Sequence, residues 1–146
     1  TGHHIPTDSP LRHMLLLVEV VDSDGLRLPL KEGLTLPDWA GIGDPREGYY
    51  AGLPGKAYAK ILKELWTEVS PSGAYWNPTN ILSDNRLAAF TSDLTRYVFT
   101  APNESPINVH VRLLYRRAFI DLMDQKKWDV PDILMEDFSI KITHLP

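Results

Sequence analysis

Cysteine is absent from the 146 residues of this sequence. Its absence excludes disulfides, thiolate metal sites, thiol nucleophiles and the covalent attachment of haem by this chain itself. The absence of cysteine does not identify the cellular compartment of the protein, because an exported protein does not require a disulfide.

Long hydrophobic runs and clustered positive charge are also scarce. No apolar stretch reaches the ~18 residues of a membrane-spanning helix, so we expect no membrane span. The formal net charge is −4, and basic residues cluster only as the pairs Arg116-Arg117 and Lys126-Lys127. A nucleic-acid surface needs a denser basic patch, so we expect no nucleic-acid partner.

Proline and glycine, in contrast, are plentiful, with 12 and 9 residues. They indicate many turns and therefore favour a strand-rich protein over a helical bundle. The hydrophobic fraction of 43% is typical of a folded globular protein. We expect residues 1–146 to form a single domain.

Five segments have the residue pattern of β-strands: 11–21, 26–31, 95–101, 107–115 and 138–143. The first is almost continuously apolar, which indicates burial on both faces. Asp24-Gly25 suits a tight turn after it, and Pro29 indicates that the returning strand lies at a sheet edge. The third and fourth segments alternate cleanly, so we predict that they pair across the turn at 102–106.

Two segments have helical spacing of apolar residues, 56–66 and 118–127. Residues 32–55 form a long excursion rich in glycine and proline, which indicates a functional or docked loop. Together these patterns predict a mainly β protein, an antiparallel Ig-like β-sandwich with two short helical insertions.

The histidine pair His3-His4 is the first candidate for chemistry. Pro6 fixes its own φ and favours an extended Ile5, so the two imidazoles lie on a stiff segment. One interpretation makes one of them a metal ligand; the other makes both solvent-exposed residues near a chain end. Adjacent side chains of an extended segment point in opposite directions, so one ion cannot easily take both.

For the other candidate residues, a purely structural role is the alternative to a functional one. His110 lies on the polar face of its predicted strand, as a solvated or hydrogen-bonded residue, and His13 and His144 have no supporting cluster. No GxSxG or HxxxH pattern is present, and Asp84 and Arg86 suit a buried structural ion pair. The loop aromatics could form a sugar-stacking platform or pin their loops to the core: Trp39, Tyr49, Tyr50, Tyr75 and Trp76.

Three segments carry a resemblance to a known family: Thr-Gly-His-His-Ile-Pro-Thr at 1–7, Asp-Asn-Arg-Leu at 84–87, and residues 111–119. In this order they resemble the C-terminal β-sandwich region of multihaem c-type cytochromes, where a TGHxxPT segment follows the CxxCH haem-binding part. The resemblance implies that His3 is an axial ligand of haem iron. His4 stands where that family often has another residue.

This sequence departs from the family pattern because it has no CxxCH. The resemblance therefore implies that the chain is part of a longer protein, that haem c is held covalently outside it, and that its partners are an upstream multihaem domain and redox proteins. It also implies electron transfer without catalysis, in the bacterial periplasm or outside the cell. Thr7 and Asp8 are candidate acceptors for the second ring nitrogen of His3.

Two further expectations complete the sequence-based hypothesis. Trp39, Tyr50 or Trp76 would pack against the haem-bearing domain. The competing hypothesis is a stand-alone extracellular β-sandwich module that binds carbohydrate or protein through its long loops.

Overall fold

The computed structural model describes residues 2–7, 9–100 and 106–143. Its strands are β1 (His13–Val21), β2 (Leu30–Glu32), β3 (Gly55–Tyr58), β4 (Lys60–Glu64), β5 (Thr79–Asp84), β6 (Val98–Phe99), β7 (Ile107–Arg116) and β8 (Ile133–Ile142). One helix, α1 (Ile120–Lys126), and two 3-10 turns, η1 (Asp38–Ala40) and η2 (Pro45–Glu47), accompany them. The prediction of a mainly β, antiparallel protein is confirmed.

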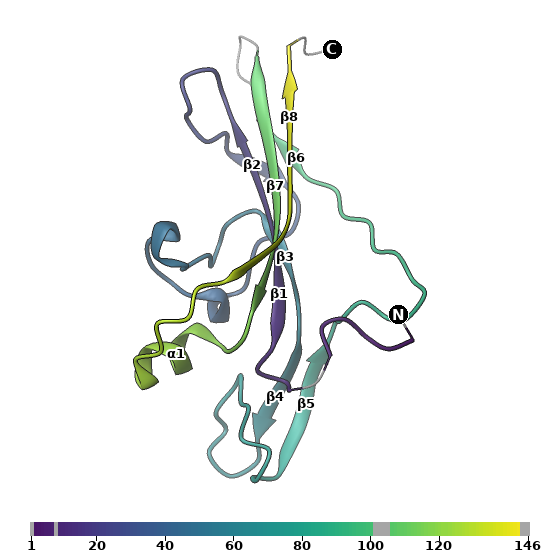
Figure 1. Ribbon diagram of the computed structural model, residues 1–146, viewed down its shortest axis with the longest axis vertical. Coiled ribbons are helices and arrows are strands. Elements are labelled where there is room, and N and C mark those ends of the chain that lie inside the picture. Colours follow the sequence, from purple (N-terminus) through teal and green to yellow (C-terminus); the bar gives the residue numbers. More distant parts are fainter. Residues whose placement is uncertain (1, 8, 101–105, 144–146) are drawn as a thin grey trace.

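The main sheet has four antiparallel strands in the order β3-β1-β7-β8. Strand β1 lies inside the sheet, pairing with β7 over its whole length and with β3 near its start. This is why its sequence is apolar on both faces. Two small sheets, β2-β6 and β4-β5, extend the molecule at its two ends (Figure 1).

One face of the main sheet is covered by the excursion at residues 32–55 together with α1 (Figure 1). Leu15, Leu17 and Leu114 of the sheet pack against Leu36 and Tyr50 of this excursion. The layer over this face is thus built from loop and 3-10 turns rather than from a second large sheet.

Arg116 of β7 holds the excursion against the sheet through hydrogen bonds. Its guanidinium, with the residue only 2% exposed, donates to the carbonyl oxygens of Ala40 at 3.0 Å and Gly48 at 2.6 Å. It also donates two hydrogen bonds to Asp132, at 2.8 and 2.7 Å. Loop carbonyls that would otherwise be buried without a partner are satisfied in this way.

The opposite side of the sheet carries the long connection between β5 and β6, with the N-terminal segment beside it (Figure 1). The Asn85 side chain accepts from the Ala59 backbone at 2.9 Å and donates to the Ala57 carbonyl at 2.6 Å. Further along, Asp93 accepts hydrogen bonds from Lys56 and Tyr58 at 2.6 and 2.7 Å. These contacts attach the connection to β3.

The prediction of a helix over residues 56–66 is wrong, because this segment forms β3 and β4. Backbone pairing with β1 and β5 overrides the local spacing, which helix and buried strand share over short runs. Leu65 and Trp66, which the helix would have buried, are 51% and 74% exposed. The predicted helix at 118–127 is confirmed as α1.

The predicted pairing of residues 95–101 with 107–115 is also wrong. Strand β6 pairs with β2 instead, and β7 lies between β1 and β8. In this arrangement the ten residues of β7 pair with two long strands, β1 and β8. In the predicted hairpin, β7 would have paired with one short strand. Residues 102–105 of the predicted turn at 102–106 lie outside the described residues.

Candidate functional site

The segment that carries His3 and His4 is anchored by one β-bridge. Ile5 and Leu87 exchange two backbone hydrogen bonds, of 2.8 and 2.9 Å. Leu87 directly follows the Asp84–Arg86 ion pair, in which both guanidinium contacts are 2.6–2.7 Å long. This pair forms as expected, but both side chains are partly exposed rather than buried.

The electrostatics also place His4 at this site. The hydrogen bonds from Arg86 are the main reason that the pKa of Asp84 is lowered, and His4 adds a smaller favourable contribution. Both His3 and His4 are exposed, while Pro6 behind them is buried. The imidazoles are therefore presented to solvent from an anchored turn.

His3 has a defined tautomer. Its Nδ1 lies 3.0 Å from the carbonyl oxygen of His4. A carbonyl oxygen only accepts, so the ring proton is on Nδ1 and the lone pair is on Nε2. The sequence pointed to Thr7 and Asp8 as acceptors; Asp8 lies outside the described residues, and the acceptor in the structure is a backbone carbonyl.

A protein-only metal centre is not formed in the part of the chain that the structure describes, where no three His, Cys, Asp or Glu side chains gather. His3 by itself can supply only one ligand. Haem iron needs no more than that from one side, because the porphyrin fills the equatorial positions. An exposed imidazole with Nδ1 protonated has the donor that such an axial position takes, and this chain has no cysteine with which to hold haem covalently.

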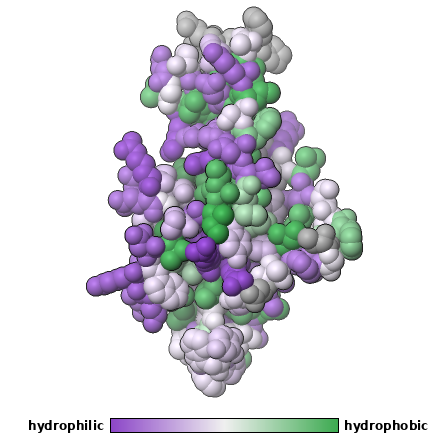
Figure 2. All heavy atoms as spheres, viewed as in Figure 1, coloured by the Kyte–Doolittle hydropathy of each residue, from purple (hydrophilic) through white to green (hydrophobic). Residues whose placement is uncertain are grey.

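The connection between β5 and β6, which is bridged to Ile5 at Leu87, carries exposed apolar side chains. On the connection bridged to Ile5, Phe90 is 91% exposed and Leu94 is 96% exposed. Figure 2 shows hydrophobic residues open to solvent in the middle of this view and on the projecting part at its right. Exposed groups of this kind mark surfaces that contact another molecule or domain.

The aromatic candidates divide into two groups. Tyr50 is 9% exposed within the core, and Trp39 packs on Phe119 with ring centroids 5.5 Å apart. Tyr50 is buried within its own fold, so the expectation that it would contact another domain is wrong, whereas for Trp39, which is half-buried, that expectation stays a prediction. Tyr75 and Trp76 remain 85% and 71% exposed, in edge-to-face contact at 5.1 Å.

A groove of ≈ 780 Å³ lies beside Tyr75 and Trp76, between their loop and α1. Trp128, 47% exposed, contributes a third aromatic ring. The loop is held by the Glu64 carboxylate, which accepts hydrogen bonds from three neighbouring side chains: Thr67, Ser72 and Asn77. These bonds lower the pKa of Glu64, so it remains ionised in this role.

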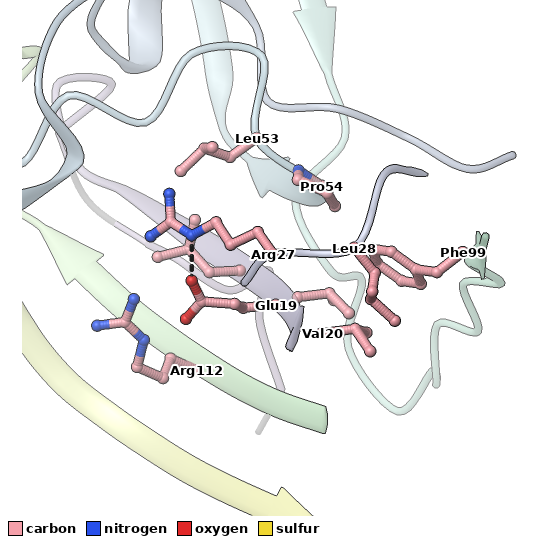
Figure 3. Close-up of a pocket in the computed structure, with 10 residues that line it drawn as sticks. Glu19, Val20, Arg27, Leu28, Leu53, Pro54, Phe99 and Arg112 are labelled. Atoms are coloured by element: carbon pink, nitrogen blue, oxygen red, sulfur yellow. Dashed lines mark hydrogen bonds and ion pairs between the residues drawn. The ribbon is translucent and has the colours of Figure 1, made fainter. Parts of the chain in front are cut away.

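A second hollow lies between β1 and the turn that follows it (Figure 3). The Glu19–Arg27 ion pair crosses it, and Leu28 and Phe99 form part of its wall. With a volume of ≈ 50 Å³, it has room for water but not for an organic ligand.

Sequence reasoning missed the burial of His13. Its ring is fully buried, stacked on Phe119 at 4.9 Å and edge-on to Trp39 at 5.2 Å. Nδ1 donates to the Leu11 carbonyl at 2.9 Å, and Nε2 is buried without a hydrogen-bond partner. His110, in contrast, is bonded to Asp137 at 2.6 Å on the sheet surface, as expected for a hydrogen-bonded strand residue.

A comparison with solved structures finds a protein with a similar fold. A penta-heme cytochrome c552 from Thermochromatium tepidum superposes with a TM-score of 0.58 over 96% of this chain, at 17% sequence identity. The match covers 33% of that protein, so this chain spans about a third of its length. This chain is therefore a β-rich protein whose fold is similar to that of about a third of this cytochrome.

No protein-family model and no curated protein matches the sequence. Within the described residues, no helix has the length and apolar character needed to cross a membrane.

Proposed function

We propose that this chain is the β domain of a multihaem c-type cytochrome and that it provides His3 as an axial ligand to a haem bound covalently elsewhere in the same protein. The observation that supports this most is the fold similarity over 96% of the chain to part of a penta-haem cytochrome. The presentation of His3 supports the assignment of the ligand.

Four features of this chain serve that role. The bridge between Ile5 and Leu87 fixes the segment, and the Nδ1–H···O contact to His4 orients the ring. In the neutral ring, this contact makes Nε2 the nitrogen that carries the lone pair. When bound, haem supplies reversible one-electron chemistry, and the low-polarity surface at Phe90 and Leu94 would exclude water from its edge.

The remaining expectations follow from this proposal. The partners would be an upstream multihaem domain and small redox proteins, and the location would be the periplasm or the cell exterior of a bacterium. The chain would have no catalytic step of its own, because an iron with both axial positions filled has no site for substrate.

Replacing His3 tests the ligand in the haem-bearing protein. His3→Ala should convert one low-spin haem to the high-spin state in absorption and EPR spectra. His4→Ala is the matched control, because it makes the same change at the adjacent exposed histidine and should leave the spectra unaltered. Unchanged spectra for His3→Ala would remove it from this role.

The coding sequence upstream of residue 1 tests the wider assignment. Several CxxCH motifs there would support a cytochrome. A signal peptide joined directly to this chain would contradict it and favour a binding module.

A carbohydrate-binding module is the second candidate, favoured by the groove beside Tyr75 and Trp76. Exposed aromatic faces next to a concave surface suit stacking against sugar rings. Tryptophan fluorescence during titration with soluble oligosaccharides should then change in the native chain and not in Trp76→Ala. Trp66→Ala is the control, since Trp66 is 74% exposed and does not line the groove.

A further inference from the structure

Strand β8 is the outer strand of the main sheet. It has ten residues and pairs with β7 alone among the strands that the structure describes. After a register shift near its start, residues 136–142 pair with β7 without interruption. Its outer edge therefore offers a straight row of backbone N–H and C=O groups to another strand.

The side chains of β8 are unusually open for a strand in the largest sheet. Phe138 is 59% exposed and Ile140 is 47% exposed, and Leu134 and Met135 exceed half. Long apolar edges of this kind are normally protected by charges, prolines or bulges, since they template pairing with other chains. Along residues 136–142 of this edge no proline occurs, and the charged residues are Glu136, Asp137 and Lys141.

The charge pattern of β8 complements itself. Side chains alternate along a strand, so Asp137, Ser139 and Lys141 share one face, and Phe138 and Ile140 share the other. In an antiparallel pair related by a two-fold axis at Ser139, each Asp137 lies opposite Lys141 of the other copy. Phe138 then lies opposite Ile140, so both faces gain favourable cross-strand pairs.

Neighbouring registers lack this match. A two-fold at Phe138 places Lys141 opposite Met135, and a two-fold at Ile140 places it opposite Ser139. A two-fold at Asp137 brings two carboxylates together, which is destabilising. Charge complementarity thus selects the Ser139 register for a second copy of this same strand.

We propose that two copies of this chain associate edge to edge through β8, antiparallel and centred on Ser139. The two four-stranded sheets then form one continuous sheet, with the interface continuing the existing ladder. The hydrogen bond between His110 and Asp137 lies beside this interface and extends the row of polar side chains onto β7. This association is independent of whether His3 binds haem iron.

The absence of cysteine allows a direct test. In Ser139→Cys, the two thiols would meet at the two-fold axis, where paired Cβ atoms are about 4.5–5.5 Å apart and a disulfide can close with a small shift. Mild oxidation should yield a covalent dimer rapidly and at low protein concentration. Ser83→Cys, at an exposed position of β5, is the matched control and should remain largely monomeric.

Charge exchange tests the register. Sedimentation equilibrium of the unmodified chain should show a reversible dimer. Lys141→Glu should weaken it by about tenfold, because like charges then face each other twice. The double variant Asp137→Lys with Lys141→Glu should restore it, whereas Lys126→Glu on α1 should have no effect.

Several results would overturn the proposal. The first is a chain that is strictly monomeric in sedimentation equilibrium. The second is equal cross-linking of Ser139→Cys and Ser83→Cys. The third is a dimer whose dissociation constant does not change in Lys141→Glu. A haem-bearing protein in which another segment of the same chain protects the β8 amides from hydrogen exchange would also contradict it.

Discussion

At the scale of single residues, the ring of His13 shows how burial decides protonation. It lies between Phe119 and Trp39, and the positive charge of Arg116 is close enough to act on it. Removal from water, the largest effect, and this charge lower the pKa of His13 from 6.5 to about 4, against the raising influence of the Leu11 hydrogen bond. The ring is therefore a neutral core residue at physiological pH.

This burial predicts a pH-dependent stability. Between pH 6.5 and about 4 the unfolded chain binds a proton at His13 that the folded chain does not, so the free energy of unfolding falls as pH decreases. The loss should reach about 3 kcal/mol below pH 4, with no contribution above pH 6.5. Urea unfolding from pH 4 to 8 measures it.

The control for this prediction is His13→Phe, which keeps an aromatic ring in the cluster and should flatten the dependence in this window. The carboxyls of Glu64, Asp84 and Asp93 have lowered pKa values, so their stabilising contributions are lost as pH falls from the unfolded values of 4.5 for Glu64 and 3.8 for the two aspartates; these losses are common to both proteins and cancel in the comparison. The same slope in both proteins would contradict the assignment.

Arg116 permits a second test at this scale. Arg116→Met would leave the Ala40 and Gly48 carbonyls and the Asp132 carboxylate without their donor, at a cost of about 3 kcal/mol in unfolding free energy. Arg117→Met is the matched control, because Arg117 is exposed and should change stability by less than about 0.5 kcal/mol. Thermal denaturation of the native protein and both variants measures these changes in stability.

At the scale of elements, the close approach of β3 to β1 depends on Gly55. A Cβ atom at this position would lie 2.1 Å from the Leu16 carbonyl oxygen, a backbone atom that cannot rotate away. The same strand carries Lys56 and Tyr58, which hold Asp93 of the connection between β5 and β6. The β3–β1 spacing therefore influences the segment that anchors His3.

Gly55→Ala should separate these strands and destabilise the protein by about 2 kcal/mol. Hydrogen exchange at the amides of β3 and of Leu87 should accelerate together. Gly2→Ala has no atom within 4 Å of the added methyl group and should leave both quantities unchanged. Exchange that accelerates in β3 alone would show that the two regions are uncoupled.

At the scale of the whole molecule, the main sheet separates two differently covered sides, as Figure 1 shows. The excursion and α1 cover one side with a packed core. The other carries the β5–β6 connection, whose Phe90 and Leu94 have no core to enter. Under the proposed function, this second side faces the haem-bearing part.

Replacing Phe90 and Leu94 by serine separates docking from folding. Because both side chains are more than 90% exposed, the double variant should keep the stability of this chain within about 0.5 kcal/mol. Under the proposed function, the same variant in the haem-bearing protein should raise the high-spin fraction of one haem, because the contact between this chain and the haem-bearing part is weakened. A matched change at Leu26, 67% exposed near the Gly25 turn, should have no spectral effect.

Local chemistry made part of this fold predictable. Several elements could be predicted because their patterns depend on neighbours in sequence. They are the apolar strand β1, the alternating strand β7, the end of β8 and the Asp24-Gly25 turn. The exposed His3-His4 pair was found for the same reason: Gly2 and Pro6 mark an irregular, stiff segment.

The sequence by itself determined that the segments of β1, β7 and the end of β8 are extended, that the chain turns at Asp24-Gly25, and that no cysteine can attach a cofactor. Only the tertiary structure decided that β7 lies between β1 and β8, that residues 55–64 are strands, and that His13 and Arg116 are buried. The physical reason is that pairing and burial depend on contacts between distant segments, whose free energies exceed the small local preferences of any one of them.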